Sequence, residues 1–265
     1  MHCRGAWDMS ERGGLRMLGD FIAKGLPRYE AERGKAAEPT VARISPYLHF
    51  GQLSPRHAMR ALADAGCKRA SKTFWRRLVW RDLAYWQLHH WPHLPTRPVR
   101  AAYADVEWSA DGAHLRAWQR GRTGFPLVDA GMRELWATGY MHQSVRIVAA
   151  LFLTEYLNMS WVHGARWFHD TLVDGDLAIN CMMWQNGGKT GLDPWNFTST
   201  PFNKSTDPAG HYIRRCAAST LDAHVWSLGC FLLCTCVQAG AQRLVQLRRY
   251  CDPEACAVHF WCQLE

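Results

Sequence analysis

The longest helical pattern in the sequence runs from Lys72 to Trp91, 20 residues without Gly or Pro. Apolar side chains at helical spacing form one stripe, made of Trp75, Val79, Leu83 and Trp86. A second face carries Arg77, Trp80, Arg81 and Ala84. Guanidinium groups beside an indole suit a stacked base or flavin next to a phosphate. The same pattern is typical of a half-buried helix whose arginines pair with carboxylates elsewhere, so both interpretations stay open.

Other segments also show helix signals. Ser54-Pro55 is an N-cap followed by a proline at the first helical position, and Pro126 opens a segment that Gly139 closes. Strand-like alternation with hairpin turns is almost absent, and no internal repeat is found. We therefore predict an all-α, multi-helix fold.

A second candidate site lies in the segment LVDGDLAINCMMWQNGG. Its central part is a predicted helix that carries Asp176, Asn180 and Trp184 at successive i,i+4 steps. A carboxylate, an amide and an indole on one line suit a heterocycle, because they offer an acceptor, a mixed donor and acceptor, and an aromatic edge. Alternatively, Asp174 and Asp176 only cap the start of a helix. The motif alone does not choose between these roles.

A third feature is the stretch RISPYLHFGQLSPR, where Arg43, Ser45 and a turn offer groups that bind phosphate. No metal site is expected. The histidines lack Cys partners and an HExxH arrangement, and the cysteines near the C-terminus lack CxxC spacing.

The composition limits the class of protein and its partners. The chain of 265 residues is 48% apolar and 20% charged, with a net charge of +8, which favours polyanionic partners such as DNA. Its 14 Trp exceed what a generic core needs. No membrane span or secretory leader is predicted, so we expect an intracellular protein with free thiols, in a nucleus or organelle if eukaryotic and in the cytoplasm if bacterial. Seven of ten Cys fall in the last 50 residues, and we place a domain boundary near Arg215, between residues 1–215 and a divergent Cys-rich tail, 216–265.

Six segments, in order and spacing, closely resemble the FAD-binding domain of the DNA photolyase/cryptochrome family. They are RISPYLHFGQLSPR, FWRRLVWRDLAYW, WQRGRTGFPLVDAGMREL, TGYMHQSVRIVAALFL, WFHDTLVDGDLAIN and DPAGHYIRR. The resemblance runs from about Leu18 to Arg215. It implies an all-helical domain that holds FAD in a U-shaped form, at the bottom of a cavity that faces DNA in the photolyases.

The resemblance also implies roles for single residues. It places Tyr29, Arg43 and Ser45 near the phosphates, Phe74, Arg81 and Phe168 at the cofactor, and Gln143 where an asparagine near the adenine is usual. It makes Arg146 and Asp174 an ion pair beside the flavin, Asp176 the carboxylate at the N–H edge of the ring, and Asn180 the residue facing flavin N5. Trp184, Trp161 and Trp108 match the tryptophan chain that passes electrons to photoexcited flavin. The alternative is that these three are core residues only.

The expected function is a light-dependent flavoprotein, a DNA photolyase that repairs UV-induced pyrimidine lesions by electron transfer, with Arg77 and Trp80 at the lesion. Arg77 stands where many dimer photolyases have a glutamate, and Asn186 replaces one of two tryptophans that clamp the dimer. A cryptochrome-type photoreceptor that signals to partner proteins is therefore the alternative, and a flavin-free nucleic-acid-binding helical protein is a third. The chain is expected to be a monomer, and a fragment that lacks the N-terminal antenna domain of the family.

Overall fold

The computed structural model describes residues 7–66, 68–187, 190, 201 and 204–218, apart from the side chains of 68–71 and 217–218. Within these residues the chain is helical and contains no β-strand, which confirms the predicted all-α class. Backbone contacts divide the chain into one compact unit, Met1–Cys216, and a second, Ala217–Glu265. The tail lies outside the described residues from 219 onward, so the predicted domain assignment stays a prediction.

The N-terminal part of the first unit forms its own small core. It consists of α1 (Glu11–Asp20), a π-helical turn (Phe21–Gly25), a 3-10 turn (Leu26–Arg28), α2 (Tyr29–Glu32), α3 (Ser45–His49) and α4 (Pro55–Asp64). Ser10 caps α1 by accepting from the N–H of Gly13, and Ser54 with Pro55 begins α4 as predicted. Phe21, Tyr29, Tyr47 and Leu62 are among the buried residues of this N-terminal core.

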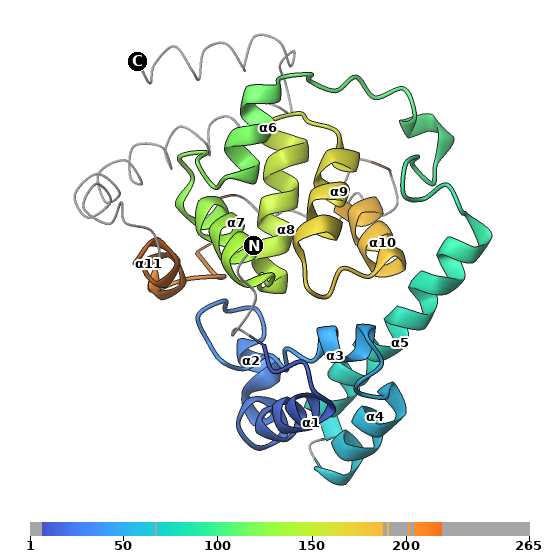
Figure 1. Cartoon of the computed structure of the whole chain (residues 1–265), viewed down its shortest axis with the longest axis vertical. Helices are drawn as coiled ribbons and strands as arrows, with labels where there is room; N and C mark the ends of the chain where they lie inside the picture. The colour runs from blue at the N-terminus through green and yellow to red at the C-terminus, as the bar shows by residue number, and fades with distance from the viewer. Residues whose placement is uncertain (1–6, 67, 188–189, 191–200, 202–203, 219–265) are drawn as a thin grey trace. The chain divides into compact units, whose positions relative to one another are not determined.

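Helix α5 (Lys68–His90) connects this N-terminal core to the rest of the unit (Figure 1). It begins four residues before the predicted start, and the sequence misjudged which of its faces is buried. Its buried positions are Phe74, Leu78 and Ala84. The predicted apolar stripe lies at the surface instead, with Trp75 46% and Trp86 53% exposed.

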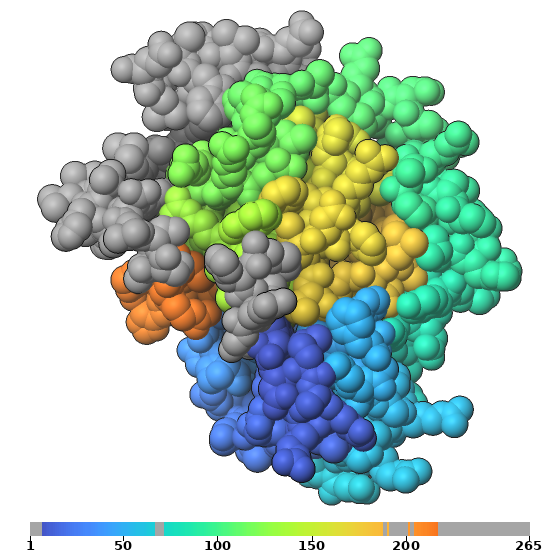
Figure 2. All heavy atoms as spheres, in the orientation of Figure 1, coloured from blue at the N-terminus to red at the C-terminus, as the bar shows by residue number. Residues whose placement is uncertain are grey.

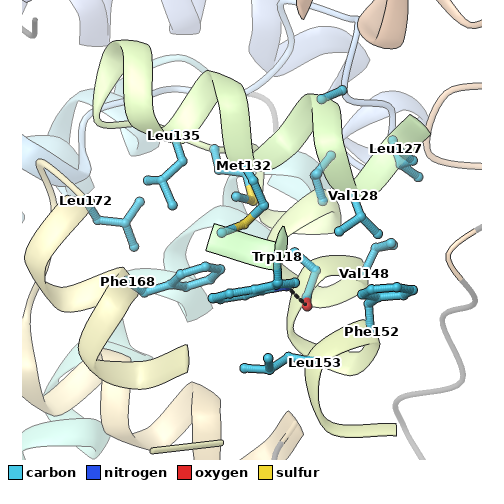
Figure 3. Close-up of a cluster of buried hydrophobic side chains, with 14 of the residues drawn as sticks. Trp118, Leu127, Val128, Met132, Leu135, Val148, Phe152, Leu153, Phe168 and Leu172 are labelled. Atoms are coloured by element: carbon cyan, nitrogen blue, oxygen red, sulfur yellow. Dashed lines mark hydrogen bonds between the residues drawn. The ribbon is translucent and has the colours of Figure 1, made fainter. Parts of the chain in front are cut away.

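The main core lies between helices α6 (Gly112–Gln119), α7 (Pro126–Thr138), α8 (Gln143–Leu151) and α9 (Trp161–Thr171), with a 3-10 turn (Ala101–Tyr103) before them and a π-helical turn (Phe152–Tyr156) after α8. Trp118 is fully buried at its centre, stacks on Phe168 at 5.9 Å, and donates to the carbonyl of Ala149 at 2.9 Å (Figure 3). Helix α7 ends at Gly139, whose φ of 70° is the left-handed conformation that a helix C-cap requires.

Helices α10 (Leu177–Gly187) and α11 (His211–Ala218) complete the described fold. Helix α10 packs against both α5 and α9, and Ala84, Ala178 and Met182 form a small apolar cluster where α5 meets α10. Small residues at this contact let the two helices approach closely. The α5–α10 contact therefore joins the helix with the exposed tryptophans to the helix that carries the predicted Asp176–Asn180–Trp184 line.

Candidate cofactor site

A pocket of about 620 Å³ opens beside α8, the α9–α10 loop and α10. This volume includes space that is open to solvent. Apolar side chains make most of the wall, and five lining residues have polar or charged side chains. The lining residues are Gln143, Arg146, Ile147, Ala150, Leu151, Phe168, Leu172, Asp174, Gly175, Asp176, Ile179, Asn180, Met183, Trp184 and Gly187.

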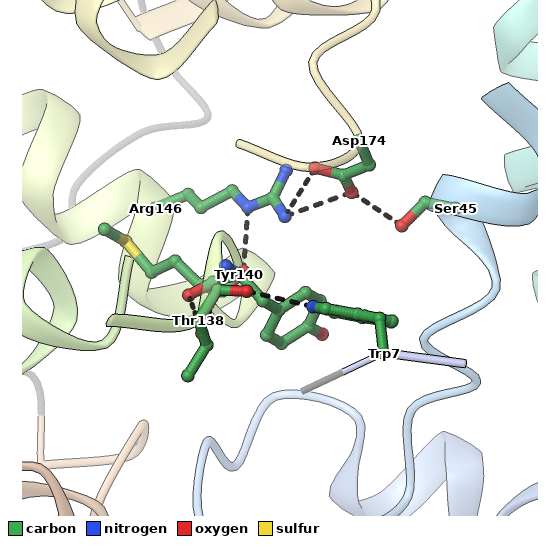
Figure 4. Close-up of polar contacts among 7 residues, drawn as sticks. Trp7, Ser45, Thr138, Tyr140, Arg146 and Asp174 are labelled. Carbon is green, nitrogen blue, oxygen red and sulfur yellow. Dashed lines mark hydrogen bonds and ion pairs between the residues drawn. The ribbon is translucent and has the colours of Figure 1, made fainter. Parts of the chain in front are cut away.

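An ion pair closes one end of the pocket. The guanidinium of Arg146 contacts both carboxylate oxygens of Asp174 at 3.1 Å, and the hydroxyl of Ser45 donates to the same carboxylate at 2.6 Å (Figure 4). The Nε of Arg146 also donates to the carbonyl of Met141 at 2.7 Å, which fixes the guanidinium plane. Because Ser45 lies on α3 and Arg146 on α8, the network links the N-terminal core to the pocket wall. The predicted Arg146–Asp174 pair is present.

Asp176 caps α10 and also lines the pocket. Its Oδ1 accepts from the N–H of Ile179 at 3.1 Å, which is the bond of a helix N-cap at the start of α10. Its Oδ2 accepts from the hydroxyl of Tyr85 at 2.7 Å and lies 3.4 Å from the guanidinium of Arg81. The side chain is 2% exposed and lines the pocket. A cap and a pocket carboxylate are therefore the same residue.

Asn180 and Trp184 line the pocket from successive turns of α10. The amide nitrogen of Asn180 donates to the carbonyl of Ala165 on α9 at 2.8 Å, so its position is fixed. The indole of Trp184 meets Phe168 edge to face at 5.2 Å. Helices α9 and α10 thus hold the amide and the indole in a defined order along one wall.

A cluster of aromatic and cationic groups lies behind the ion pair. The guanidinium of Arg43 lies 4.2 Å from the ring centre of Tyr140 and 5.2 Å from that of Trp7. Arg43 has a φ of 52°, a rare conformation for a residue with a side chain, and such conformations concentrate at functional sites. Burial raises the pKa of Tyr140 to about 12, although Arg146 and Arg43 oppose this shift. Two arginines with one carboxylate leave this end of the pocket cationic.

Buried His142 begins α8 beside this cluster. Its Nδ1 accepts from the N–H of Ser144 at 3.2 Å and so caps the helix. Burial, followed by the charges of Arg146 and Arg43, lowers the pKa of His142 to about 4. The imidazole is neutral at physiological pH, as an acceptor cap requires.

The pocket brings together most, though not all, of the predicted cofactor residues. Those that line it are Gln143, Arg146, Phe168, Asp174, Asp176 and Asn180, and the predicted relay residue Trp184 lines it as well. Tyr29 and Phe74 are instead buried in the N-terminal core, with ring centres 5.6 Å apart. Arg43, Ser45 and Arg81 lie one shell further out, where they contact residues at the pocket's polar end.

The other two predicted relay tryptophans, Trp161 and Trp108, do not line the pocket. Trp161 is buried in the main core, and Trp108 packs against that core while partly exposed. The backbone flanking Trp108 bonds to Asn158, because the N–H of Ser109 donates to the Asn158 carbonyl at 2.8 Å. Since α9 begins three residues later, Trp108 lies near the helix end that carries Trp161.

Sequence reasoning missed three residues of the polar end. His49 Nδ1 lies 3.5 Å from Asp176, Tyr85 donates to the same carboxylate, and the ring of Tyr140 lies beneath Arg43. Tyr85 and Arg81 occupy α5 four residues apart, so helical spacing from Arg81 was the signal for Tyr85. His49 and Tyr140 carry no comparable local signal, because His49 ends the short helix α3, Tyr140 lies just after α7, and only tertiary contacts bring them to the site.

Within the described ranges there is no cluster of three potential metal ligands and no helix long and apolar enough to cross a membrane. The helical fold and the mostly apolar pocket, with acidic and cationic groups at one end, define a helical cofactor-binding domain. Residues 74–221 match the family model described as the FAD binding domain of DNA photolyase. The chain therefore belongs to the DNA photolyase/cryptochrome family.

Relatives in this family include both named types. The chain is 37% identical over 221 residues to a deoxyribodipyrimidine photo-lyase of Agrobacterium fabrum, covering 79% of this chain and 45% of the relative. It is 34% identical over 224 residues to Cryptochrome-1 of Arabidopsis thaliana, covering 79% and 33% respectively. The chain thus spans less than half the length of these curated relatives.

Solved structures show the same similarity. A class III photolyase from Agrobacterium tumefaciens superposes with a TM-score of 0.73 at 36% identity, covering 79% of this chain and 45% of that one. A cryptochrome from Synechocystis superposes with a TM-score of 0.73 at 28% identity, with the same coverage.

The residues of the pocket fit FAD, the cofactor of the matched domain. Asp176 is a buried acceptor suited to a ring N–H, Asn180 offers its amide oxygen, and aliphatic walls suit a flat heterocycle. Arg43 has positive charge suited to a phosphate, and Arg146 pairs with Asp174. The donor and acceptor set agrees with the cofactor of the family.

Proposed function

We propose that this chain is the FAD-binding part of a light-dependent flavoprotein, a DNA photolyase that repairs UV-induced pyrimidine lesions by photoinduced electron transfer. The observation that carries the proposal is the single pocket wall that presents Asp174, Asp176, Asn180 and Trp184. We further propose that the protein acts as an intracellular monomer on damaged DNA. Residues 1–215 would form the cofactor domain and 216–265 a separate tail.

FAD, when bound, supplies the light absorption and the one-electron redox chemistry. The chain holds and orients it. Asp176 would accept a hydrogen bond from the ring, while Tyr85 and Arg81 hold this carboxylate in place. Asn180, fixed by its bond to Ala165, would face the ring's reactive edge. The Arg146–Asp174 pair and Arg43 balance the charge at the polar end of the pocket.

Trp184, Trp161 and Trp108 would pass electrons from the protein surface to the pocket. An indole is oxidised more readily than most side chains, and a row of indoles divides one long transfer into short steps. Trp184 is in the pocket wall, Trp161 is buried in the main core at the start of α9, and Trp108 is partly exposed. One tryptophan in the wall, one in the core and one that is partly exposed support the relay.

A lesion must be flipped out of the duplex to reach a pocket of this kind. Trp80 is 49% exposed on α5, and its indole is available to stack on a flipped base. Arg77 is also exposed on that helix, where its charge suits a phosphate. We propose these two residues as the lesion contacts.

The test is made on the purified full chain. Visible absorbance of bound flavin is expected first, then repair of a UV-damaged oligonucleotide under blue light and none in the dark. A colourless chain contradicts the cofactor assignment. A yellow chain that leaves the oligonucleotide unrepaired contradicts the photolyase assignment alone.

Arg77 favours a second candidate function, a cryptochrome-type photoreceptor. A cation in place of the glutamate of many dimer photolyases alters the lesion contact, while the pocket is unaffected. The cryptochrome relatives agree with this candidate. It predicts photoreduction without repair, and restored repair in an Arg77→Glu variant would return the assignment to photolyase.

A further inference from the structure

Gly164 lies where α9 and α10 approach most closely around an indole. A Cβ built on Gly164 would lie 2.7 Å from Cζ2 of Trp184 and 2.7 Å from Cδ2 of Leu153, and closer still to Cη2 of the indole. Real Cβ atoms essentially never come so near another heavy atom. Leu153 can rotate its methyl group away, whereas the indole is rigid and buried. Only a residue without a side chain leaves room for Trp184 as it lies.

The face of α9 that receives this indole also carries its two aromatic neighbours. Trp161, Gly164 and Phe168 occupy positions i, i+3 and i+7, which form one stripe of an α-helix. Phe168 contacts Trp184 at 5.2 Å on one side of Gly164, and Trp161 lies one turn away on the other. Trp184 is thus placed on the α9 stripe that leads toward Trp161.

We propose that Gly164 is a positioning residue that seats the indole of Trp184 against α9 and thereby sets its separation from Trp161. This inference rests on the proposed function for its electron-transfer consequence. Gly164 does not line the pocket, so it acts through Trp184 and leaves the cofactor contacts to other residues.

The proposed electron path shows why the position of Trp184 next to Gly164 matters. Trp184 gives one electron to the light-excited cofactor, which is reduced, and the oxidised Trp184 takes one electron from Trp161. Trp161 is restored by Trp108, and Trp108 by a thiol reductant in solution. A wider gap between Trp184 and Trp161 slows the second transfer and lets the first electron return, so the net yield falls.

The first measurement needs neither light nor flavin. Gly164→Ala should lower the melting temperature of the full chain, because the methyl group displaces Trp184. In a Trp184→Phe background the outer indole atoms are gone, and the same change should cost much less. Gly19→Ala is the matched control, since a Cβ at Gly19 in α1 meets nothing within 4 Å. If Gly164→Ala lowers the melting temperature equally in both backgrounds, Gly164 does not position Trp184.

The second measurement is the photoreduction rate of FAD-loaded protein with added thiol. Gly164→Ala should reduce the rate per bound flavin about tenfold, since a misplacement of about 1 Å can cost up to about 100-fold. The electron-transfer role would be overturned if Gly164→Ala lowers the melting temperature through Trp184 as expected but leaves the photoreduction rate unchanged. If the unmodified chain is not photoreduced, the proposed function fails, and the melting experiment alone decides whether Gly164 seats Trp184.

Discussion

The tryptophans of the main core and those of α5 lie in different environments. Trp118, Trp161 and Trp184 are 0%, 3% and 3% exposed, whereas Trp75, Trp80 and Trp86 are 46%, 49% and 53% exposed. The buried group lies among α6 to α10, and Figure 2 shows the side chains of α5 at the surface beside them. An indole at helical spacing therefore identifies a helix, but its environment decides between packing, electron transfer and surface contact.

The contrast extends to charged and titratable groups. Near the pocket, His142 is buried and the side chain of Asp174 is 7% exposed, and both are hydrogen-bonded within the fold. On the surface, His89 on α5 and the Lys24–Asp20 pair are exposed. The loss of stability on substitution should therefore differ several-fold between the two environments.

The largest difference is expected at Trp118. Trp118→Ala removes a fully buried indole and its bond to Ala149, and deletions of this kind cost about 3–5 kcal/mol. Denaturant unfolding of the full chain measures the loss. A Trp118→Phe variant should keep normal photoreduction, because this indole is outside the proposed relay. Slowed photoreduction in that variant would show that Trp118 also carries electrons.

Much of this contrast was predictable, and the failures have physical causes. The long helix, the Pro126–Gly139 segment and the Arg146–Asp174 pair follow from local spacing and family resemblance, and the structure contains all three. The buried face of α5 was not predictable, because its outward stripe is as apolar as its inward one. Hydrophobic spacing cannot distinguish the two when a neighbouring helix such as α10, far along the chain, selects the face.

Some contacts at the polar end of the pocket could not be predicted from the sequence either. His49 reaches the polar end from the last position of α3. Tyr140 and Trp7 reach it from irregular segments, whose course depends on tertiary contacts such as the bond from Trp7 to the carbonyl of Thr138 at 2.9 Å. For Asp176, the sequence offered a helix cap and a cofactor ligand as alternatives. The two carboxylate oxygens of Asp176 allow both, because one makes the cap bond and the other accepts from Tyr85.

The next largest effect is a pH dependence from His142. Its pKa is about 4 in the folded chain against an ordinary 6.5, so the unfolded state binds the extra proton first as the pH falls. Stability is full above pH 6.5 and declines toward pH 4, by at most about 3 kcal/mol from this residue. Unfolding free energies measured across this range should show the slope.

Two variants isolate the slope. His142→Asn keeps a side-chain acceptor at the helix cap but cannot be protonated, so the decline should flatten. His89→Asn on the exposed face of α5 should leave it unchanged. A slope that survives His142→Asn would assign the titration to another group.

A smaller effect is expected at the ion pair. Asp174→Asn leaves the guanidinium of Arg146 without its counter-charge in a partly buried place and should cost about 2 kcal/mol, within the range of charged hydrogen bonds. Asp20→Asn is the control, because its pair with Lys24 is exposed and such pairs contribute about 0.5 kcal/mol or less. Equal losses in thermal unfolding would mean that the pocket's ion pair is as well solvated as the surface pair.

The smallest effect, and the sharpest test of the comparison, is expected at Trp75. Its indole is 46% exposed, and surface substitutions usually change stability by about 0.5 kcal/mol or less. Alanine also has the higher helix propensity, which offsets part of the lost contact. Trp75→Ala should thus unfold at nearly the same denaturant concentration as the unmodified chain, while Trp118→Ala does not. A loss near that of Trp118→Ala would mean that the stripe of α5 is covered in solution, because an indole stabilises the fold to that extent only when its surface is removed from water.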